Sequence, residues 1–220
     1  MSLPNQQADW ARLFRIACAL IRQVNSEQFI IDHWTLGGGT AMMLQIDHRE
    51  SQDVDIFLSD PQLLSFLDPQ KRDFQFEIWP AAYEGDGTSF QKLAFDGIGE
   101  IDFIVGRTMT PSPTTEAIIE GETTLLETIP EIIAKKIYHR GSSIKPRDIF
   151  DIAAAGEGHA DIVVKALRPY RSEVQITLGV IERLNPEFVS DAIAQLAIKD
   201  KFRSIAKTAL KGAKELLRAV

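Results

Sequence analysis

Apolar residues near the start of the chain recur every three or four positions. From about Gln6 to Val24 they form one stripe of an amphipathic helix, made up of Trp10, Phe14, Ala17, Ile21 and Val24. A helix of this kind turns its apolar stripe towards a core, so we expect the segment to pack against the rest of the chain.

The next elements follow the order strand, turn, helix, strand. His33–Leu36 predicts a short strand that three glycines interrupt, and Thr40–Ile46 has the alanine, methionine and leucine content of a helix capped by Thr40. Asp53–Leu58 then alternates carboxylates with apolar residues, which is typical of a strand with two different faces. Because the period is two, both carboxylates of this segment are expected on one face.

Further strands are expected before the proline pair at Pro111-Ser-Pro113. Phe74–Trp79 and Ser89–Phe95 are strand-like, and the loop Glu84–Thr88 between them is rich in residues that tolerate positive φ. Together these segments predict a hairpin. Gly99–Val105 alternates as another strand, and the prolines that follow predict the end of the sheet.

Helical patterns fill the chain from Pro130, including 135–140, 146–155 and most of 160–220. The order of elements predicts an α+β fold, with a mixed, partly antiparallel sheet followed by a C-terminal helical region. We therefore expect a core at 1–110, which includes the N-terminal helix, and a helical region at 111–220.

The composition is that of a globular protein. Of the 220 residues, 45% are hydrophobic and 25% are charged, which excludes a disordered or collagen-like chain. The single cysteine, Cys18, excludes a disulfide framework and a thiolate metal cluster. The start of the chain lacks the pattern of a secretory signal, and no apolar run reaches the roughly 20 residues that span a bilayer. We expect a cytoplasmic protein with no membrane partner.

Charge is uneven along the chain. The net charge is −7, but residues 199–220 carry seven basic residues against two acidic ones, a local +5, so the other 198 residues total −12. The basic residues of this segment could line an RNA backbone, or they could be the solvated face of an amphipathic helix. In the second case the inward side would hold Phe202, Ile205, Ala209, Leu210, Ala213 and Leu217.

Three aspartates stand on expected strands, Asp53 and Asp55 on one and Asp102 on a later one. Carboxylates that face one way from neighbouring strands can hold one or two Mg²⁺ ions, and two such ions can clamp the attacking and leaving oxygens of a phosphoryl transfer. The alternative is a strand with a solvated acidic face. Glu100 is expected on the same strand face as Asp102 and is the second candidate for its role.

The glycines before Thr40 supply a second feature of a nucleotide site. Gly38 and Gly39 let the backbone approach a triphosphate, and Thr40 opens a helix whose free N–H groups attract anions. The spacing of a Walker loop is absent from the sequence. Gly38-Gly39, thirteen intervening residues, Asp53-x-Asp55 and a later Asp102 with apolar neighbours resemble the pattern of DNA polymerase β-like nucleotidyltransferases.

Two segments resemble one family within that superfamily. The run His48-Arg-Glu-Ser-Gln-Asp-Val-Asp-Ile-Phe57 is similar to the HR-x-S-x-D-x-D-x-F segment of the AbiEii-type nucleotidyltransferase toxins. Lys136, on an expected helix at 132–140, and the run Arg147-Asp-Ile-Phe-Asp151 are similar to that family's helical lysine and RD-x-x-D element. The resemblance covers residues 33–155.

The resemblance implies roles for the residues that carry it. Asp53 and Asp55 would be metal ligands, and Asp102 would be a ligand or the base that accepts the proton of the attacking hydroxyl. Lys136 would contact the triphosphate, with Lys135 as an alternative.

Four further residues have several possible roles. Arg49 and Ser51 could touch phosphate or brace the loop, while Asp148 and Asp151 could orient the lysine or help to activate the acceptor. For the lysines the alternative is an ordinary solvated helix face, and for Asp148 it is an interaction with the helix dipole alone.

The family is known to use a nucleoside triphosphate and Mg²⁺ to modify a target such as tRNA, usually under the control of an antitoxin encoded beside it. The resemblance therefore implies a nucleotidyltransferase that releases pyrophosphate and modifies RNA, as the toxin of a toxin–antitoxin or phage-defence system. Two alternatives stay open. One is the same chemistry on a small molecule, as in aminoglycoside nucleotidyltransferases, or on a protein hydroxyl; the other is a non-catalytic interaction module on the same fold.

Overall fold

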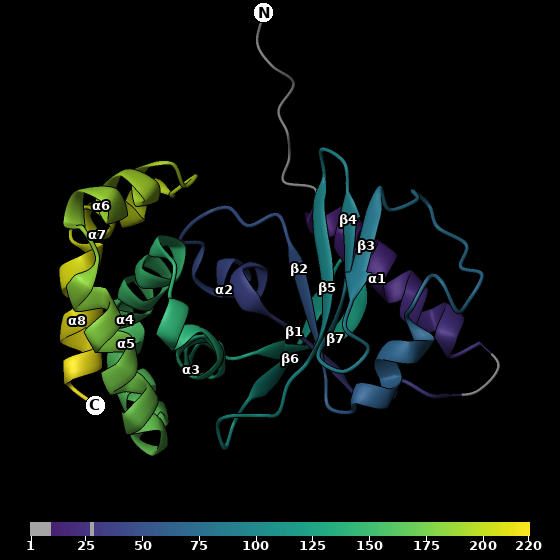
Figure 1. Cartoon of the computed structure of the whole chain (residues 1–220), viewed down its shortest axis with the longest axis horizontal. Helices are drawn as coiled ribbons and strands as arrows, with labels where there is room; N and C mark the ends of the chain where they lie inside the picture. The colour runs from purple at the N-terminus through teal and green to yellow at the C-terminus, as the bar shows by residue number, and fades with distance from the viewer. Residues whose placement is uncertain (1–9, 27–28) are drawn as a thin grey trace, which may run out of the picture. The chain divides into compact units, whose positions relative to one another are not determined.

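A computed structural model describes residues 10–26 and 29–220 (Figure 1). Contacts divide the chain into two compact units. The first holds the described residues up to Ala41, with Ser51–Arg107 and Thr114–Glu127; the second holds Met42–Glu50, Thr108–Pro113 and Thr128–Val220. This division differs from the predicted regions 1–110 and 111–220, because the chain returns to the first unit after residue 113.

The first unit contains a mixed sheet of seven strands in the order β3-β4-β5-β2-β1-β7-β6 (Figure 1). β1 is parallel to β7 and β2 is parallel to β5, while the other neighbours are antiparallel. The predicted α+β fold with a mixed, partly antiparallel sheet is confirmed. The strands are β1 (Trp34–Gly37), β2 (Val54–Leu58), β3 (Ala82–Gly85), β4 (Phe90–Phe95), β5 (Gly99–Val105), β6 (Thr114–Ile119) and β7 (Glu122–Glu127).

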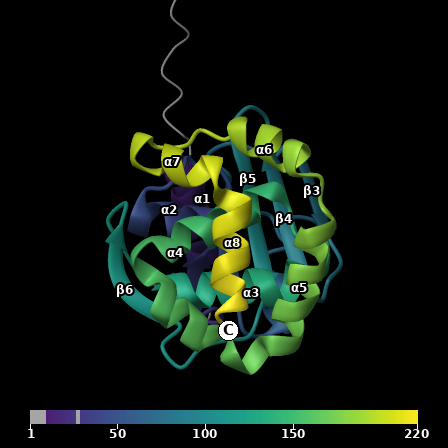
Figure 2. The same ribbon diagram turned by 90° about the vertical axis from the view of Figure 1, so that its left-hand side faces the viewer.

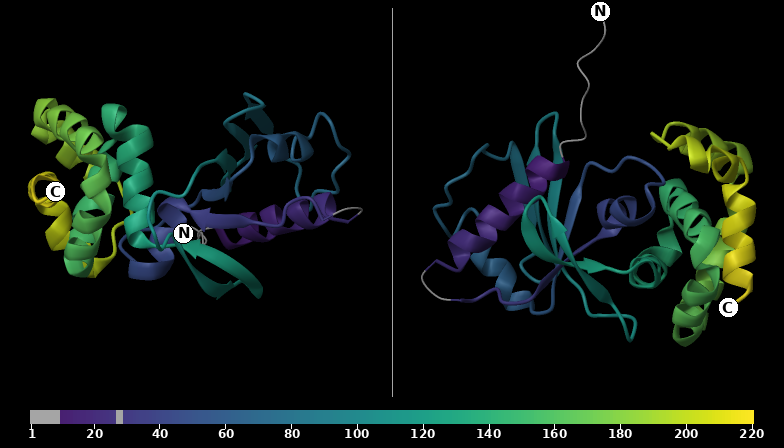
Figure 3. Two further views of the ribbon diagram at one scale, coloured as in Figure 1. Left: turned by 90° about the horizontal axis from the view of Figure 1, so that it is seen from below. Right: turned by 180° about the vertical axis from the view of Figure 1, so that it is seen from behind.

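Helix α1 (Trp10–Val24) lies along one face of this sheet, against β2 and β5 (Figure 3). The predicted stripe is confirmed, because Phe14, Ala17 and Val24 are fully buried. Residues 6–9, which the prediction included, lie outside the described residues. Cys18 is buried in this helix, and burial raises the pKa of its thiol to about 12, so the thiol is inert at neutral pH.

The prediction of a strand at Phe74–Trp79 is wrong. The backbone of Gln75 bonds the side chain of Gln23 in α1 instead of a neighbouring strand, through the Gln75 N–H at 2.8 Å and its carbonyl at 2.9 Å. The ring of Phe76 packs on both Phe74 and Trp79, so the aromatic residues that suggested a strand form a cluster. The first strand of the hairpin is β3, which pairs with β4.

The sheet does not end at Pro113, contrary to the prediction. β6 and β7 form a hairpin with a two-residue loop, Glu120-Gly121, in which both residues have positive φ. Turns of this kind match the twist of paired strands. The strands themselves are rich in β-branched residues, which favour strands. The sequence prediction gave more weight to the prolines before them and ended the sheet too early.

Helix α2 (Gly38–Ile46) begins two residues before the predicted start, so Thr40 lies inside its first turn and does not cap it. The remaining α-helices belong to the second unit, where α8 packs on α4 and α5 (Figure 2). They are α3 (Ile129–Arg140), α4 (Pro146–Leu167), α5 (Arg171–Arg183), α6 (Pro186–Ala194), α7 (Arg203–Lys207) and α8 (Ala209–Arg218). Short 3-10 helices occur in both units, namely η1 (Pro61–Phe66) in the first and η2 (Gly141–Ser143), η3 (Arg168–Tyr170) and η4 (Asp200–Phe202) in the second. Within residues 10–26 and 29–220, none of the helices combines the length and the apolar character that crossing a membrane requires.

Candidate functional site

A row of polar residues crosses three neighbouring strands of the first unit and ends at a glycine on a fourth. Asp55 on β2 is the register partner of Gly37 on β1 and of Asp102 on β5, and Asp102 is the partner of Lys92 on β4. Side chains of directly paired residues share one face of a sheet. The sheet therefore brings Asp55, Asp102 and Lys92 together, as the alternation had predicted for the two aspartates.

The glycine turn lies against the carboxylate of Asp55. Gly38 has a φ of +66°, which favours glycine, and a Cβ atom at this position would lie 1.7 Å from Oδ2 of Asp55. The helix α2 starts at the same residue, so the positive end of its dipole lies beside this carboxylate. Within the first turn, the hydroxyl of Thr40 donates a hydrogen bond to the carbonyl of Asp53 and ties the helix to the start of β2.

Asp53 lies one residue before β2 begins. Its Oδ1 accepts a hydrogen bond from the backbone N–H of Glu100, at 3.3 Å, which holds the side chain near the start of β5. Asp53 thus lies beside the start of β5, two residues before Asp55 along the chain.

Asp102 has an unusual electrostatic environment. Its side chain is 18% exposed. Burial raises its pKa to about 6, and the negative charge of Asp55 adds to the effect. Oδ1 of Asp102 is buried and has no hydrogen-bond partner within the part of the chain that the structure describes. A carboxyl with these properties is suited to accept a proton near neutral pH.

Lys92 was missed in the sequence. Its ammonium contacts the carboxylate of Glu100 and lies 3.6 Å from Oδ2 of Asp102. Burial would lower the pKa of Lys92, but the Glu100 hydrogen bond and the Asp102 charge raise it above its ordinary value. The sequence contained a signal for Lys92. The short turn at 96–98 pairs Phe95 with Gly99, and three residues further along each strand this register pairs Lys92 with Asp102.

The donors of this group suit a hard divalent cation, since they are carboxylate oxygens and one of them, Oδ1 of Asp102, is buried without a partner among the described residues. Across residues 10–26 and 29–220, however, no three His, Cys, Asp or Glu side chains are already gathered as a metal site. Mg²⁺ is commonly held by one or two carboxylates together with substrate phosphates, not by a complete protein cage. The metal role of Asp53, Asp55 and Asp102 therefore stays a prediction.

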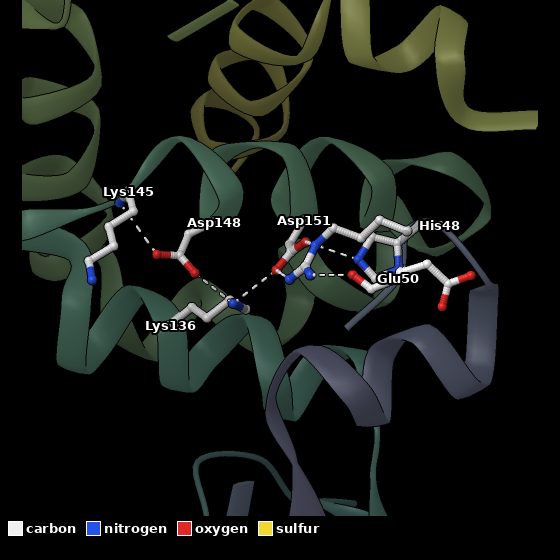
Figure 4. Close-up of polar contacts among 7 residues, drawn as sticks. His48, Glu50, Lys136, Lys145, Asp148 and Asp151 are labelled. Atoms are coloured by element: carbon white, nitrogen blue, oxygen red, sulfur yellow. Dashed lines mark hydrogen bonds and ion pairs between the residues drawn. The ribbon is translucent and has the colours of Figure 1, made fainter. Parts of the chain in front are cut away.

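A buried network in the second unit centres on Asp151 (Figure 4). The guanidinium of Arg49 donates two hydrogen bonds to its carboxylate, at 2.8 and 3.0 Å, and Nε2 of His48 lies 2.9 Å from Oδ1. The Lys136 ammonium lies 2.9 Å from Oδ2 of Asp151 and 2.6 Å from Oδ1 of Asp148. The network fixes the segment before Ser51 to α3 and α4.

The charges of this network are matched. Burial alone would raise the pKa of Asp151, but Lys136 and Arg49 hold it well below its ordinary value. Burial would likewise lower the pKa of Lys136, and Asp151 and Asp148 raise it instead. Both carboxylates and the lysine are thus charged in the folded protein, and the alternative of a solvated helix face for Lys136 is wrong, because its side chain is 9% exposed.

The other predicted residues lie around these two groups. Lys135 is also buried, with its ammonium 3.8 Å from Oε1 of Glu131, and Ser51 is half-buried in the loop before β2. Asp148 also accepts a hydrogen bond from the backbone N–H of Lys145 at the start of α4, so it serves the helix terminus and Lys136 together. Arg49, Lys135, Lys136 and Asp148 belong to the second unit, whereas the glycines, Thr40, Ser51 and the three aspartates of the sheet belong to the first.

Comparisons with known proteins identify the family and the fold of the chain. The family model for the nucleotidyl transferase AbiEii toxin of type IV toxin–antitoxin systems matches residues 19–218. No curated protein matches the chain in sequence. Of the solved structures, an H. pylori protein assigned as a nucleotidyltransferase shares 16% identity, over 97% of this chain and 94% of its own, with a TM-score of 0.52. JHP933 from Helicobacter pylori shares 16% identity, over 99% of this chain and 92% of its own, with a TM-score of 0.50.

At 16% identity these two structures show likeness of fold alone. The family match carries more, because it spans nearly the whole chain and extends beyond residues 33–155 in both directions. This chain belongs to the AbiEii nucleotidyltransferase toxin family and is a nucleotidyltransferase.

Proposed function

We propose that the protein transfers a nucleoside monophosphate from a nucleoside triphosphate to a hydroxyl of RNA, with tRNA as the expected class, and that it needs Mg²⁺. The observation that carries this proposal is the pairing of Asp55 with Asp102 beside the Gly38 turn. A cation held by this pair would lie next to the positive end of α2, where a phosphate can bind.

Asp53, Asp55 and Asp102 would hold one or two Mg²⁺ ions. When bound, the metal would neutralise charge on the triphosphate and on the departing pyrophosphate. In its alternative role Asp102 leaves the metal to Asp53 and Asp55 and accepts the proton of the acceptor hydroxyl. The hydroxyl oxygen then bonds to the α-phosphorus, and the bond to pyrophosphate breaks.

Backbone groups and lysines would bind the triphosphate. Gly38, Gly39 and Thr40 form the first turn of α2 and offer free N–H groups to a phosphate. Lys136 is our first candidate for a side-chain contact, with Lys135 second. Because Asp148 and Asp151 already neutralise the Lys136 ammonium, a phosphate contact would have to replace one of these carboxylates.

In the second unit, the bidentate bond of Arg49 to Asp151 favours a bracing role for Arg49 over phosphate contact. Asp148 orients Lys136 in this proposal. Ser51, in the first unit, keeps its two candidate roles, contact with a phosphate or support of the loop.

A basic groove in the second unit favours RNA as the acceptor. Helices α6, α7 and α8 enclose a groove of about 660 Å³, in which Lys207, Lys211, Lys214 and Arg218 outnumber Glu187 and Glu215. Ala213, Leu216 and Leu217 of α8 are buried and do not line the groove, so the predicted amphipathic character is present together with a basic side. Cations in a row at helical spacing can neutralise successive backbone phosphates.

Membership of a type IV toxin–antitoxin family supports a further part of the proposal, namely that an antitoxin controls this protein. An acceptor on a small molecule or on a protein hydroxyl would leave the chemistry at Asp55 and Asp102 unchanged, so acceptor and chemistry need separate readouts.

The test incubates the protein with each α-labelled nucleoside triphosphate, Mg²⁺ and total tRNA. We expect label on the RNA, and none with Asp55→Asn or after chelation of the metal. Label on polypeptide or on an aminoglycoside, but never on RNA, would overturn the choice of acceptor. Unchanged labelling by Asp55→Asn would overturn the site itself.

A further inference from the structure

Lys92 has no place in the family resemblance, yet it faces the carboxylates of the proposed metal site. Its ammonium contacts Glu100 and lies 3.6 Å from Oδ2 of Asp102, and the negative charges of Asp102 and Asp53 both stabilise the ammonium. We propose that Lys92 is a built-in counter-cation that holds Asp102 in the metal-free protein and gives it up when metal and nucleotide bind together. This inference rests on the proposed function of the same site.

The position of Lys92 is fixed by the sheet. Gln91 and Leu93 on either side of it are buried, and the register of β4 with β5 places its Cα opposite that of Asp102. The Lys92 side chain itself is 31% exposed. A four-carbon stem with a mobile ammonium can therefore change partner without any change in the backbone.

Charge explains why such a change would accompany binding. Asp55, Asp102, Glu100 and Asp53 gather at one end of paired strands, and like charges so close destabilise one another. Lys92 relieves this repulsion in the metal-free protein. A divalent ion bound at Asp102 would lie within a few ångströms of the ammonium and would be repelled by it.

The triphosphate resolves that conflict. It brings several negative charges to the site, so the ammonium can leave Asp102 for a phosphate oxygen while the metal takes its place. Lys92 thus acts as a positioning residue that makes metal binding depend on the nucleotide. Without nucleotide, metal should bind weakly, and the weakness should be due to Lys92.

The test measures Mn²⁺ binding to the intact protein without nucleotide, by the loss of the electron paramagnetic resonance signal of free Mn²⁺. We expect Lys92→Met to bind Mn²⁺ about three- to tenfold more tightly than the wild type, the range for one charge interaction near a protein surface. Lys92→Arg keeps the charge and should behave as the wild type. The matched control is Lys71→Met, since Lys71 pairs with Asp68 in the same unit and lies outside the row of Asp55, Asp102 and Lys92.

A second readout moves in the opposite direction. With saturating Mn²⁺, Lys92→Met should bind a fluorescent nucleoside triphosphate more weakly than the wild type by about three- to tenfold, because a phosphate contact is lost. A merely structural lysine would change the unfolding temperature and neither affinity, and we would measure that temperature for each variant.

Lys92→Met that binds Mn²⁺ no more tightly than the wild type would overturn the inference. If RNA labelling by the wild type persists in that case, the proposed function stands. Conversely, tighter Mn²⁺ binding by Lys92→Met that disappears when Asp55→Asn is added, with no nucleotide transfer to any acceptor, would support the inference and overturn the proposed function.

Discussion

Gly38 illustrates how a single residue can determine the geometry of this site. Gly38→Ala would add a Cβ atom that overlaps Oδ2 of Asp55 at a φ of +66°. We expect the backbone strain alone to cost about 1–2 kcal/mol, and the displacement of Asp55 to lower the rate of nucleotide transfer by about 100-fold. Gly87→Ala is the matched control, because Gly87 has a φ of +74° and open space around its Cβ position. Equal activity in the two variants would show that the contact with Asp55 is unimportant.

Asp102 gives a prediction about stability. Its pKa is raised to about 6 in the folded protein, so it binds its proton more tightly there than in the unfolded chain. The resulting stabilisation is present at acidic pH and is lost as the pH rises through about 6. With a chelator present at pH 7–8, the free energy of unfolding of Asp102→Asn should therefore be about 1–3 kcal/mol higher than that of the wild type, although the variant should be inactive. Below pH 4 the difference should disappear in chemical denaturation curves.

At the scale of elements, period-two alternation predicted β2 and β5 and placed Asp55 beside Asp102, because each strand has one buried face that fixes its register. The same reasoning failed at Phe74–Trp79, where a side chain of α1 replaced the neighbouring strand. It also missed β6 and β7, which pair with each other through a two-residue loop, because the prolines before them outweighed their β-branched residues. Only the pairing of β7 with β1 joins residues distant in sequence, and local sequence does not contain it.

The buried network gives a prediction about two helices. Lys136→Met would leave Asp148 and Asp151 without their shared cation, and we expect a loss of about 3–5 kcal/mol in the free energy of unfolding. Lys71→Met, which breaks an exposed pair, should cost less than about 1 kcal/mol. Chemical denaturation of both variants at pH 7 provides the measurement, and a small loss for Lys136→Met would mean that the two carboxylates find other partners.

Acidification should disrupt the same network from the side of its carboxylates. Because the pKa of Asp151 is held well below its ordinary value, its contribution is present at neutral pH and is lost as the pH falls below about 4, through the pKa of the folded protein. The wild type should thus lose stability more steeply in acid than Lys136→Met does. Parallel pH profiles for the two proteins would contradict the assignment of this network.

At the scale of the whole molecule, motif spacing predicted members of both residue groups but could not tell which role each one has. The lysine that the family pattern marks, Lys136, is buried between two carboxylates, whereas the lysine beside the sheet aspartates, Lys92, lies in a segment without a motif. The spacing of motif residues along the chain shows which residue types are present and in which order. Burial and register depend on the folded chain, and they show which carboxylates each lysine meets.

The basic groove carries the last prediction. Lys207, Lys211 and Lys214 lie on one side of α7 and α8, and reversing their charges should weaken tRNA binding and reduce its dependence on salt, because fewer counterions are released on binding. Each lost phosphate contact should lower the slope of log affinity against log salt by about 0.7–0.9. The control is a variant with Lys71→Glu, Lys165→Glu and Arg168→Glu, all exposed and outside the groove, which lowers the net charge by the same amount as three reversals in the groove. An equal loss of affinity in the control would show that the total charge of the molecule governs binding, and that the groove itself has no special part in it.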